Sequence, residues 1–182
     1  MMEKQVQEKA KKKLSNFETN FDKVSSEAFA KASIKPKQKL YVAGPWFDER
    51  ANALMQMVKE LFRQYDSVSA WEPYFPMDHT QESPSLTFVD NVNQISSCEA
   101  ILALISRKDV GTAFEIGLAK GLGRKIYLLT LDETDYNSVT NIMLAYSTMY
   151  RIQLKDLWKF IIGKTSYEDL IQIPDTWENK EW

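Results

Sequence analysis

The sequence has little of several residue types on which particular classes of protein depend. It holds one cysteine, Cys98, and one histidine, His79, among 182 residues. A single cysteine excludes an internal disulfide framework and a multi-cysteine zinc or iron–sulfur site, and a single histidine excludes a paired-histidine metal site. The longest uninterrupted apolar run, residues 100–105, is too short to span a bilayer. These absences favour a metal-free domain in a reducing cytoplasm.

An excess of charge of one sign is also missing. Lys and Arg number 23 against 25 Asp and Glu, so bulk attraction to nucleic acid or to an anionic membrane is not expected. The charge is uneven, because residues 1–39 carry +5 and the remainder carries -7. In the first segment, apolar residues at intervals of 3 and 4 predict one helical stripe, namely Leu14, Phe17, Phe21, Val24 and Ala28. We interpret residues 1–38 as a helical arm that packs on its own domain or on a sister subunit.

The patterning of residues 39–182 predicts strands that alternate with helices. We expect strands at 39–43, 68–71, 100–105 and 125–131, and helices at 51–65, 88–95, 113–120, 154–162 and 167–171. Three prolines predict a loop over residues 72–84. This alternation predicts an α/β domain: a doubly wound, flavodoxin-like parallel sheet of about five strands with helices on both faces. Ligands of such sheets bind beyond the carboxyl ends of the strands.

Nucleotide-binding motifs are also scarce among the segments that follow the strands. There is no Walker A loop, and Gly121-Leu122-Gly123 follows a helix instead of opening one, so it is no dinucleotide fingerprint. A serine nucleophile elbow is missing too. Carboxylates, amides and aromatic residues remain as the groups that can carry chemistry.

The segment 109–117 is the most informative of these. Thr112 and Glu115 have the spacing of a capping box at a helix start, which is a purely structural interpretation. The same geometry also favours a functional one, because a carboxylate in the first helical turn is kept ionised by the positive end of the helix. An ionised, positioned Glu115 suits attack on an electrophilic sugar carbon. Asp109, just before it, is placed to orient the sugar hydroxyls.

Three segments together, 41–47 (YVAGPWF), 109–117 (DVGTAFEIG) and 140–143 (TNIM), resemble the nucleoside 2-deoxyribosyltransferases in order and approximate spacing. The resemblance implies an enzyme that moves 2-deoxyribose between purine or pyrimidine bases by double displacement. It implies no metal or organic cofactor. Its substrates would be deoxyribonucleosides and free bases.

The resemblance also implies roles for individual residues. Glu115 matches the nucleophile, Asp109 the sugar-binding acid, and Tyr41 the phenol that orients the nucleophile. The substrate-binding segment after the first strand contributes Gly44 and an aromatic wall for the base, Trp46 and Phe47. Residues matching Asn141 and Met143 reach into a neighbouring subunit's site in the family, so a homo-oligomer built from dimers, commonly a hexamer, is implied.

One pair departs from the family's pattern. The general acid of the family is the Asp of an Asn-Asp pair, and this chain has Asp90-Asn91. Counting back from Ile95 places Asn91 at the acid's position, although an amide binds a base without being able to protonate it. Two arrangements are open: the helix starts after Asp90 and the loop turns its carboxyl into the site, or Asn91 faces the base and Asp90 is dispensable. We expect Asp90 to be the acid and Asn91 to be among the substrate-binding residues.

Two other functions are open at this point. A hydrolase would cleave the same N-glycosidic bond, in deoxynucleosides or in their 5'-monophosphates, with water in place of the acceptor base. A non-catalytic member would bind a nucleotide without turnover. Adding or omitting a free base separates transfer from hydrolysis, and binding without turnover identifies the third.

Overall fold

The computed structural model describes residues 36–46, 49–79, 82–104, 109–130, 142–147 and 150–165. All of them belong to one compact unit of the chain, Pro36–Trp182. The expected helical arm, apart from its last three residues, and the expected helix at 167–171 lie outside the described residues.

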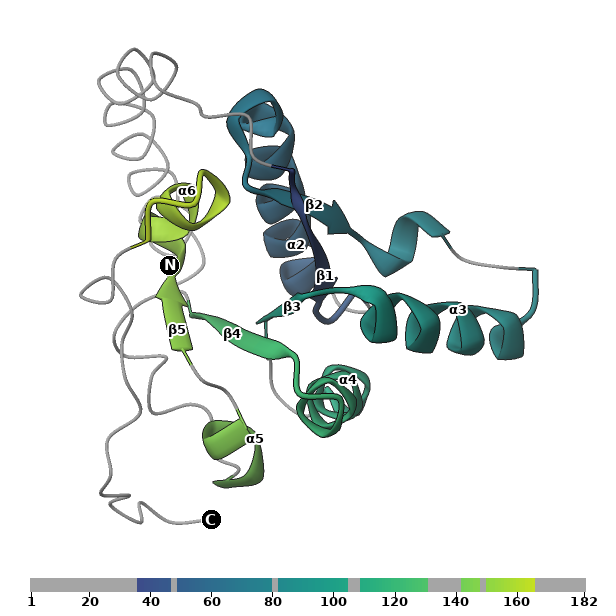
Figure 1. Cartoon of the computed structure of the whole chain (residues 1–182). Helices are drawn as coiled ribbons and strands as arrows, with labels where there is room; N and C mark the ends of the chain where they lie inside the picture. Colours follow the sequence, from purple (N-terminus) through teal and green to yellow (C-terminus); the bar gives the residue numbers. More distant parts are fainter. Residues whose placement is uncertain are drawn as a thin grey trace, which may run out of the picture. The chain divides into compact units, whose positions relative to one another are not determined.

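Five parallel strands form one sheet in the order β2-β1-β3-β4-β5 (Figure 1). The strands are β1 (Gln38–Ala43), β2 (Trp71–Tyr74), β3 (Ala100–Leu104), β4 (Lys125–Thr130) and β5 (Tyr150–Gln153). The chain first moves outward from β1 to β2 and then returns past β1 to β3. This reversal confirms the doubly wound, flavodoxin-like fold and places a switch point at the carboxyl ends of β1 and β3.

Helices cover both faces of the sheet (Figure 1). One face carries α2 (Glu49–Gln64) and α6 (Leu157–Ile161), and the other carries α3 (Pro84–Ser97), α4 (Val110–Gly121) and α5 (Ile142–Ser147). Short 3-10 turns connect them: η2 (Asp66–Val68), η3 (Pro76–His79) and η5 (Leu154–Asp156). Local chemistry sets the start of α3, because the Ser83 side chain accepts a hydrogen bond from the Leu86 N–H and Pro84 occupies the first turn.

The core lies on both faces of the sheet because strand side chains alternate between them. Against α3 and α4, strand residues Tyr41, Ile101 and Ile126 pack with Ile95 and Ile116 in one buried cluster. Their neighbours Leu40, Val42 and Leu102 are equally buried and face the α2 and α6 side. Strands buried on both faces explain the continuous apolar runs of β1 and β3.

Two strands differ from the sequence prediction. The strand expected at 68–71 lies at Trp71–Tyr74, inside the predicted loop, and η2 ends at Val68. The loop prediction was wrong here because β2 is an edge strand, where a proline such as Pro73 removes no hydrogen bond from the interior of the sheet. The fifth strand, β5, was not located, since Arg151 and Gln153 look exposed in the sequence but are buried.

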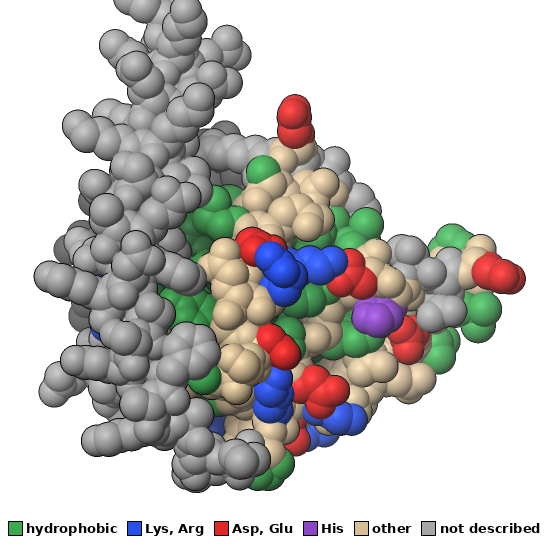
Figure 2. Space-filling view, turned by 90° about the horizontal axis from the view of Figure 1, so that it is seen from above, with side chains coloured by type: hydrophobic (Ala, Val, Ile, Leu, Met, Phe, Trp, Pro, Cys, Tyr) green, Lys and Arg blue, Asp and Glu red, His purple; other side chains and the backbone are tan. Residues whose placement is uncertain are grey.

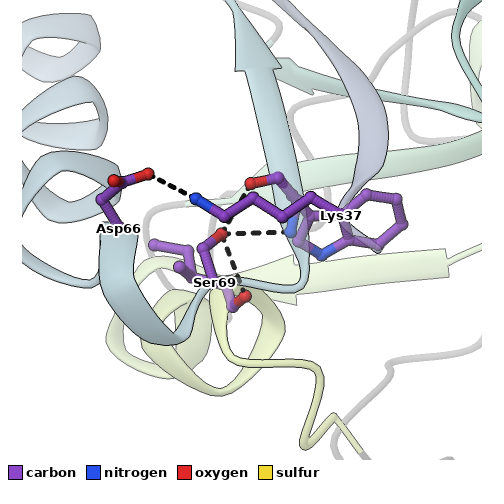
Figure 3. A network of polar contacts seen from close by, with 5 residues as sticks. Lys37, Asp66 and Ser69 are labelled. Atoms are coloured by element: carbon purple, nitrogen blue, oxygen red, sulfur yellow. Dashed lines mark hydrogen bonds and ion pairs between the residues drawn. The ribbon is translucent and has the colours of Figure 1, made fainter. Parts of the chain in front are cut away.

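Hydrogen bonds tie the end of α6 to the edge strand β2. Ser69 Oγ accepts from the Trp71 N–H at 3.1 Å and donates to the Trp71 carbonyl at 2.8 Å (Figure 3). The Trp71 indole N–H donates to the Phe160 carbonyl at 2.9 Å, and the Ala70 N–H donates to the Ile161 carbonyl at 2.8 Å. These bonds connect the last described helix to the first strands.

Charges of both signs are interspersed over the face of the molecule seen in Figure 2. Ion pairs such as Lys59 with Asp78, at 2.6 Å, lie at the surface. Within the described ranges, no helix is long and apolar enough to cross a membrane. The same residues contain no group of three or more His, Cys, Asp or Glu side chains arranged to hold a metal ion.

Candidate active site

Two tyrosines lie side by side on adjacent strands. Tyr41 of β1 and Tyr74 of β2 are register partners, so both side chains leave the same face of the sheet. Their rings stack with centroids 5.7 Å apart and planes 22° from parallel. Tyr41 is fully buried. The pair therefore forms a rigid aromatic floor beneath α3 and α4.

Each phenol donates a hydrogen bond to a carboxyl group from a different helix. The Tyr41 O–H donates to Glu115 Oε1 of α4 at 2.6 Å. The Tyr74 O–H donates to Asp90 Oδ2 of α3 at 2.6 Å. The stacked rings thus bring together two carboxyl groups that lie 25 residues apart in the sequence.

Burial shapes the acid–base properties of this cluster. Burial raises the pKa of Glu115 to about 7, the charge of Asp109 adds to the rise, and the hydrogen bond from Tyr41 opposes it. Burial and the neighbouring Glu115 hold the pKa of Tyr41 far above its usual range. Burial and the bond to Asp90 raise the pKa of Tyr74 as well. Both phenols therefore remain donors near neutral pH, while Glu115 exchanges its proton there.

The start of α4 differs from the predicted capping box. The cap is Asp109, whose carboxylate accepts from the Gly111 N–H at 3.1 Å and from the Thr112 hydroxyl. The helix therefore begins at Val110, and Glu115 lies in its second turn and faces Tyr41. The capping box was wrong because Asp109 supplies the cap and occupies the Thr112 hydroxyl. The expected lowering of the Glu115 pKa by the helix end was also wrong, because desolvation dominates.

Asp90 reaches the cluster from within α3. That helix begins at Pro84, four residues before the helix predicted at 88–95, so of the two arrangements considered for the pair, the one with Asp90 in a loop before the helix is not found. Tyr74 extends from the edge strand and meets Asp90 on the flank of the helix. Asn91, the other member of the inverted pair, is half-buried and points about 100° away around the helix.

The segment after β1 combines a packing role with an unpartnered donor. Gly44 is buried, and a Cβ placed on it would lie 2.4 Å from Met55 Sδ of α2. Trp46 is half-buried with its ring edge on Phe75, at a centroid distance of 6.5 Å. Its indole N–H is buried and has no hydrogen-bond partner among the described residues. Trp46 follows the carboxyl end of β1 by three residues.

Sequence reasoning missed two members of the cluster. Tyr74 was assigned to a loop, and His79 was given no role. The His79 ring stacks on Tyr74 with a centroid distance of 4.6 Å and an angle of 12°. The prolines around these two residues led to the prediction of a loop, so their shared position next to the switch point was not predicted. Of the other predicted site residues, Phe47 and Asn141 lie outside the described residues, and Met143 on α5 is 76% exposed.

Comparison with known proteins identifies the family of this chain. The sequence model of the family described as nucleoside 2-deoxyribosyltransferase matches residues 40–169. The chain belongs to this family. The family is enzymatic and acts on nucleosides and bases, by deoxyribosyl transfer or by N-glycosidic cleavage. No individually curated protein matches the sequence.

Two solved structures with TM-scores above 0.5 support the architecture, and a third aligns over a shorter part of the chain. The 2-deoxyribosyltransferase from Bacillus psychrosaccharolyticus has 18% identity and a TM-score of 0.58, over 76% of this chain and 99% of that chain. A conserved protein from Enterococcus faecalis V583 has 18% identity and a TM-score of 0.57, over 71% and 100%. A 2-desoxiribosyltransferase from Leishmania mexicana has 30% identity and a TM-score of 0.43, over 53% and 66%.

Proposed function

We propose that this protein transfers 2-deoxyribose between purine or pyrimidine bases, through a covalent deoxyribosyl intermediate on Glu115. The observation that carries the proposal is the 2.6 Å hydrogen bond between the Tyr41 phenol and Glu115 Oε1, at the switch point of the sheet. The bond occupies one carboxylate oxygen and leaves the other for attack. Membership of the deoxyribosyltransferase family supports this choice of reaction.

The first displacement forms the intermediate. The free oxygen of ionised Glu115 attacks the anomeric carbon, and the bond from that carbon to the base nitrogen breaks. Its electron pair passes to the base nitrogen, which takes a proton from Asp90. Asp109 caps α4 six residues before Glu115, where it can bind the sugar hydroxyls. A proton donor of this kind typically accelerates a reaction by about 10² to 10⁴-fold.

The second displacement regenerates the enzyme. The nitrogen of an incoming base attacks the anomeric carbon and releases Glu115 as a carboxylate, while the Asp90 carboxylate takes the proton of the incoming base. Two inversions at one carbon give net retention, as in retaining glycosidases. The predicted wall at Trp46 and Phe47 and the amide of Asn91 would hold both bases in turn. No step uses a metal or an organic cofactor.

The described surface supports a homo-oligomer with shared sites. Large apolar side chains are at least half exposed on α3, α4 and α5: Leu86, Phe88, Val89, Val110, Phe114 and Met143. Phe88 and Phe114 contact each other across the two helices with centroids 5.9 Å apart. A second copy covering these residues would remove them from water, consistent with the predicted contribution of Asn141 and Met143 to a neighbour's site.

Incubation with 2'-deoxyinosine and free adenine tests the proposal. The expected result is the formation of 2'-deoxyadenosine and hypoxanthine, which chromatography detects. Free deoxyribose without deoxyadenosine would identify a hydrolase, and the same assay with 5'-monophosphates would show whether nucleotides are preferred. Binding of either substrate without any product would contradict an enzymatic role.

A mixing experiment tests the shared site. Asn141→Ala and Glu115→Ala proteins should each be nearly inactive and should regain activity when dissociated and reassembled together. Some sites then combine an intact Asn141 from one subunit with an intact Glu115 from another. Absence of recovery, with subunit exchange shown by mass labelling, would place Asn141 in its own subunit's site or outside any site.

A further inference from the structure

The cluster holds a second phenol–carboxyl pair, Tyr74 with Asp90, whose phenol has no role in the reaction described above. Tyr74 donates to Asp90 Oδ2 at 2.6 Å, as Tyr41 does to Glu115. Its ring is held by Tyr41 at 5.7 Å and by His79 at 4.6 Å, both nearly parallel to it. Tyr74 is thus confined by two stacking neighbours and by its own strand. A phenol fixed in this way orients the carboxyl group that it contacts.

We propose that Tyr74 is a positioning residue that prepares Asp90 to protonate the departing base. The proposal rests on the proposed function and assigns to Tyr74 a role that the sequence did not indicate. Tyr74 acts through Asp90 and contacts no reacting atom. Its hydrogen bond engages Oδ2 and leaves Oδ1 as the oxygen that can pass a proton to the base nitrogen.

The bond from Tyr74 also assists the proton transfer itself. When the carbon–nitrogen bond breaks, its electron pair goes to the base nitrogen, the proton moves from Asp90 Oδ1 to that nitrogen, and Asp90 becomes a carboxylate. A hydrogen bond to an ionised acceptor is stronger than one to a neutral acceptor. The Tyr74 donor therefore stabilises the products of the transfer more than the reactants. This gain exists only where a proton is transferred.

The same contact accounts for the inverted pair in the sequence. Adjacent residues of a helix point about 100° apart, so Asp90 and Asn91 cannot occupy the same place on α3. Tyr74 reaches the flank on which Asp90 lies and anchors the acid there. Asn91 is left to contact the base as an amide. Asp90 lies one position before the place of the acid in the family's pattern, and a phenol from the edge strand is hydrogen-bonded to it there.

Two substrates that differ in their need for a proton test this assignment. The base of 2'-deoxyinosine needs protonation to depart, whereas that of 7-methyl-2'-deoxyguanosine is already cationic and leaves as a neutral molecule. Tyr74→Phe keeps the stacked ring and removes the donor. We expect kcat on 2'-deoxyinosine to fall about 10- to 100-fold and kcat on the cationic nucleoside to change less than about threefold, KM being similar for both. Asp90→Asn should show the same selectivity with a larger loss.

A double variant separates positioning from a structural role. Because Tyr74 acts through Asp90, adding Tyr74→Phe to Asp90→Asn should cause no further loss on 2'-deoxyinosine. Tyr127→Phe removes a phenol from the opposite face of the sheet and is the matched control, expected to retain activity on both substrates. Thermal unfolding of each variant monitors the fold.

The outcomes are distinct. Equal losses on the two substrates, additive losses in the double variant, or unchanged activity of Tyr74→Phe would each overturn the role of Tyr74, even if the wild-type protein is an active transferase. Should the wild-type protein cleave neither nucleoside, the proposed function itself fails and the role of Tyr74 fails with it.

Discussion

On the side of the sheet that α6 covers, the rings of Trp71 and Tyr127 pack with Phe160 of α6 at centroid distances of 4.8 to 6.2 Å. Beneath α3 and α4, the rings of Tyr41 and Tyr74 stack at a similar distance of 5.7 Å, but each also donates to a carboxyl group. Both faces are built from the same strands and from aromatic residues. They differ in that the second places the carboxyl groups of Glu115 and Asp90 against its phenols and removes Glu115 largely from water.

That difference separates stability from chemistry. Removing a carboxylate from water is costly, and a well-packed apolar replacement is often neutral or stabilising. Burial raises the pKa of Glu115 to about 7, so the α4 face bears a desolvation cost at this carboxyl group. Groups perturbed in this way are concentrated at functional sites. The α6 face should therefore control stability and the α4 face should control turnover.

The largest expected effect comes from Glu115→Gln. The amide still accepts the bond from Tyr41 but cannot form the covalent intermediate, so turnover should fall on the order of 10⁴ to 10⁶-fold. Steady-state transfer from 2'-deoxyinosine to adenine measures it. A folded Glu115→Gln protein that keeps a tenth of the wild-type rate would contradict the covalent mechanism.

The same variant should gain stability at alkaline pH. The pKa of Glu115 rises from an ordinary 4.5 to about 7 on folding, so between these values the folded state binds more protons than the unfolded state. Stability from this group is complete below pH 4.5 and is lost as pH rises through 7, a change of about 3 kcal/mol. Urea unfolding at pH 5 and pH 8 should show this decline in the wild-type protein and not in Glu115→Gln.

The converse effect is expected from Phe160→Ala on the other face. Phe160 is 2% exposed and stacks on Trp71 at 4.9 Å, so its truncation should cost about 3 to 5 kcal/mol of unfolding free energy. The midpoint of urea unfolding measures the loss, and Phe160→Leu should cost less. At a temperature where the variant is folded, kcat should be close to that of the wild type. A large fall in kcat without a loss of stability would contradict the division between the faces.

The sequence predicted the parts of this arrangement that depend on local pattern. The apolar runs of β1, β3 and β4 are recognisable because both faces of these strands are buried. Motif resemblance marked Tyr41 and Glu115, and these two side chains are hydrogen-bonded in the structure. A periodic helix such as α2 was also located to within two residues at each end.

The features that escaped prediction depend on tertiary position. Pro73 marks a loop in isolation and becomes acceptable only because β2 is at the edge of the sheet. Tyr74 was missed because it follows Pro73 directly. Its partner Asp90 is also 16 residues away in the sequence, so no local pattern links the two. The pKa of Glu115 was predicted with the wrong sign because a sequence shows helix position but not burial.

A smaller effect is expected from Gly44→Ala, which tests whether Gly44 serves packing or substrate. Its Cβ would lie 2.4 Å from the sulfur of the fully buried Met55, so we expect a loss of about 1 to 3 kcal/mol by overpacking. Gly117→Ala is the matched control, because its Cβ meets nothing within 4 Å inside α4 and should stabilise the helix by about 0.5 to 1 kcal/mol. A raised KM with unchanged stability in Gly44→Ala would instead indicate substrate contact.

The smallest expected effect is a pair of opposite shifts in the pH dependence of kcat/KM. The limb that reports ionisation of Glu115 should lie near pH 7 in the free enzyme. Tyr41 lowers the pKa of Glu115 by its hydrogen bond, so Tyr41→Phe should move this limb to higher pH. Asp109 raises that pKa by its charge, so Asp109→Asn should move the limb to lower pH.

Asn is the suitable replacement at position 109 because it caps a helix about as well as Asp, so the start of α4 is preserved. Each shift is expected to be about one pH unit, equivalent to a tenfold change in rate well below the pKa. Loss of sugar contacts in Asp109→Asn would lower kcat/KM at every pH and leave the position of the limb to report the charge effect alone. Limbs that move in the same direction, or that both stay at the wild-type position, would mean that the group titrating near pH 7 is not Glu115.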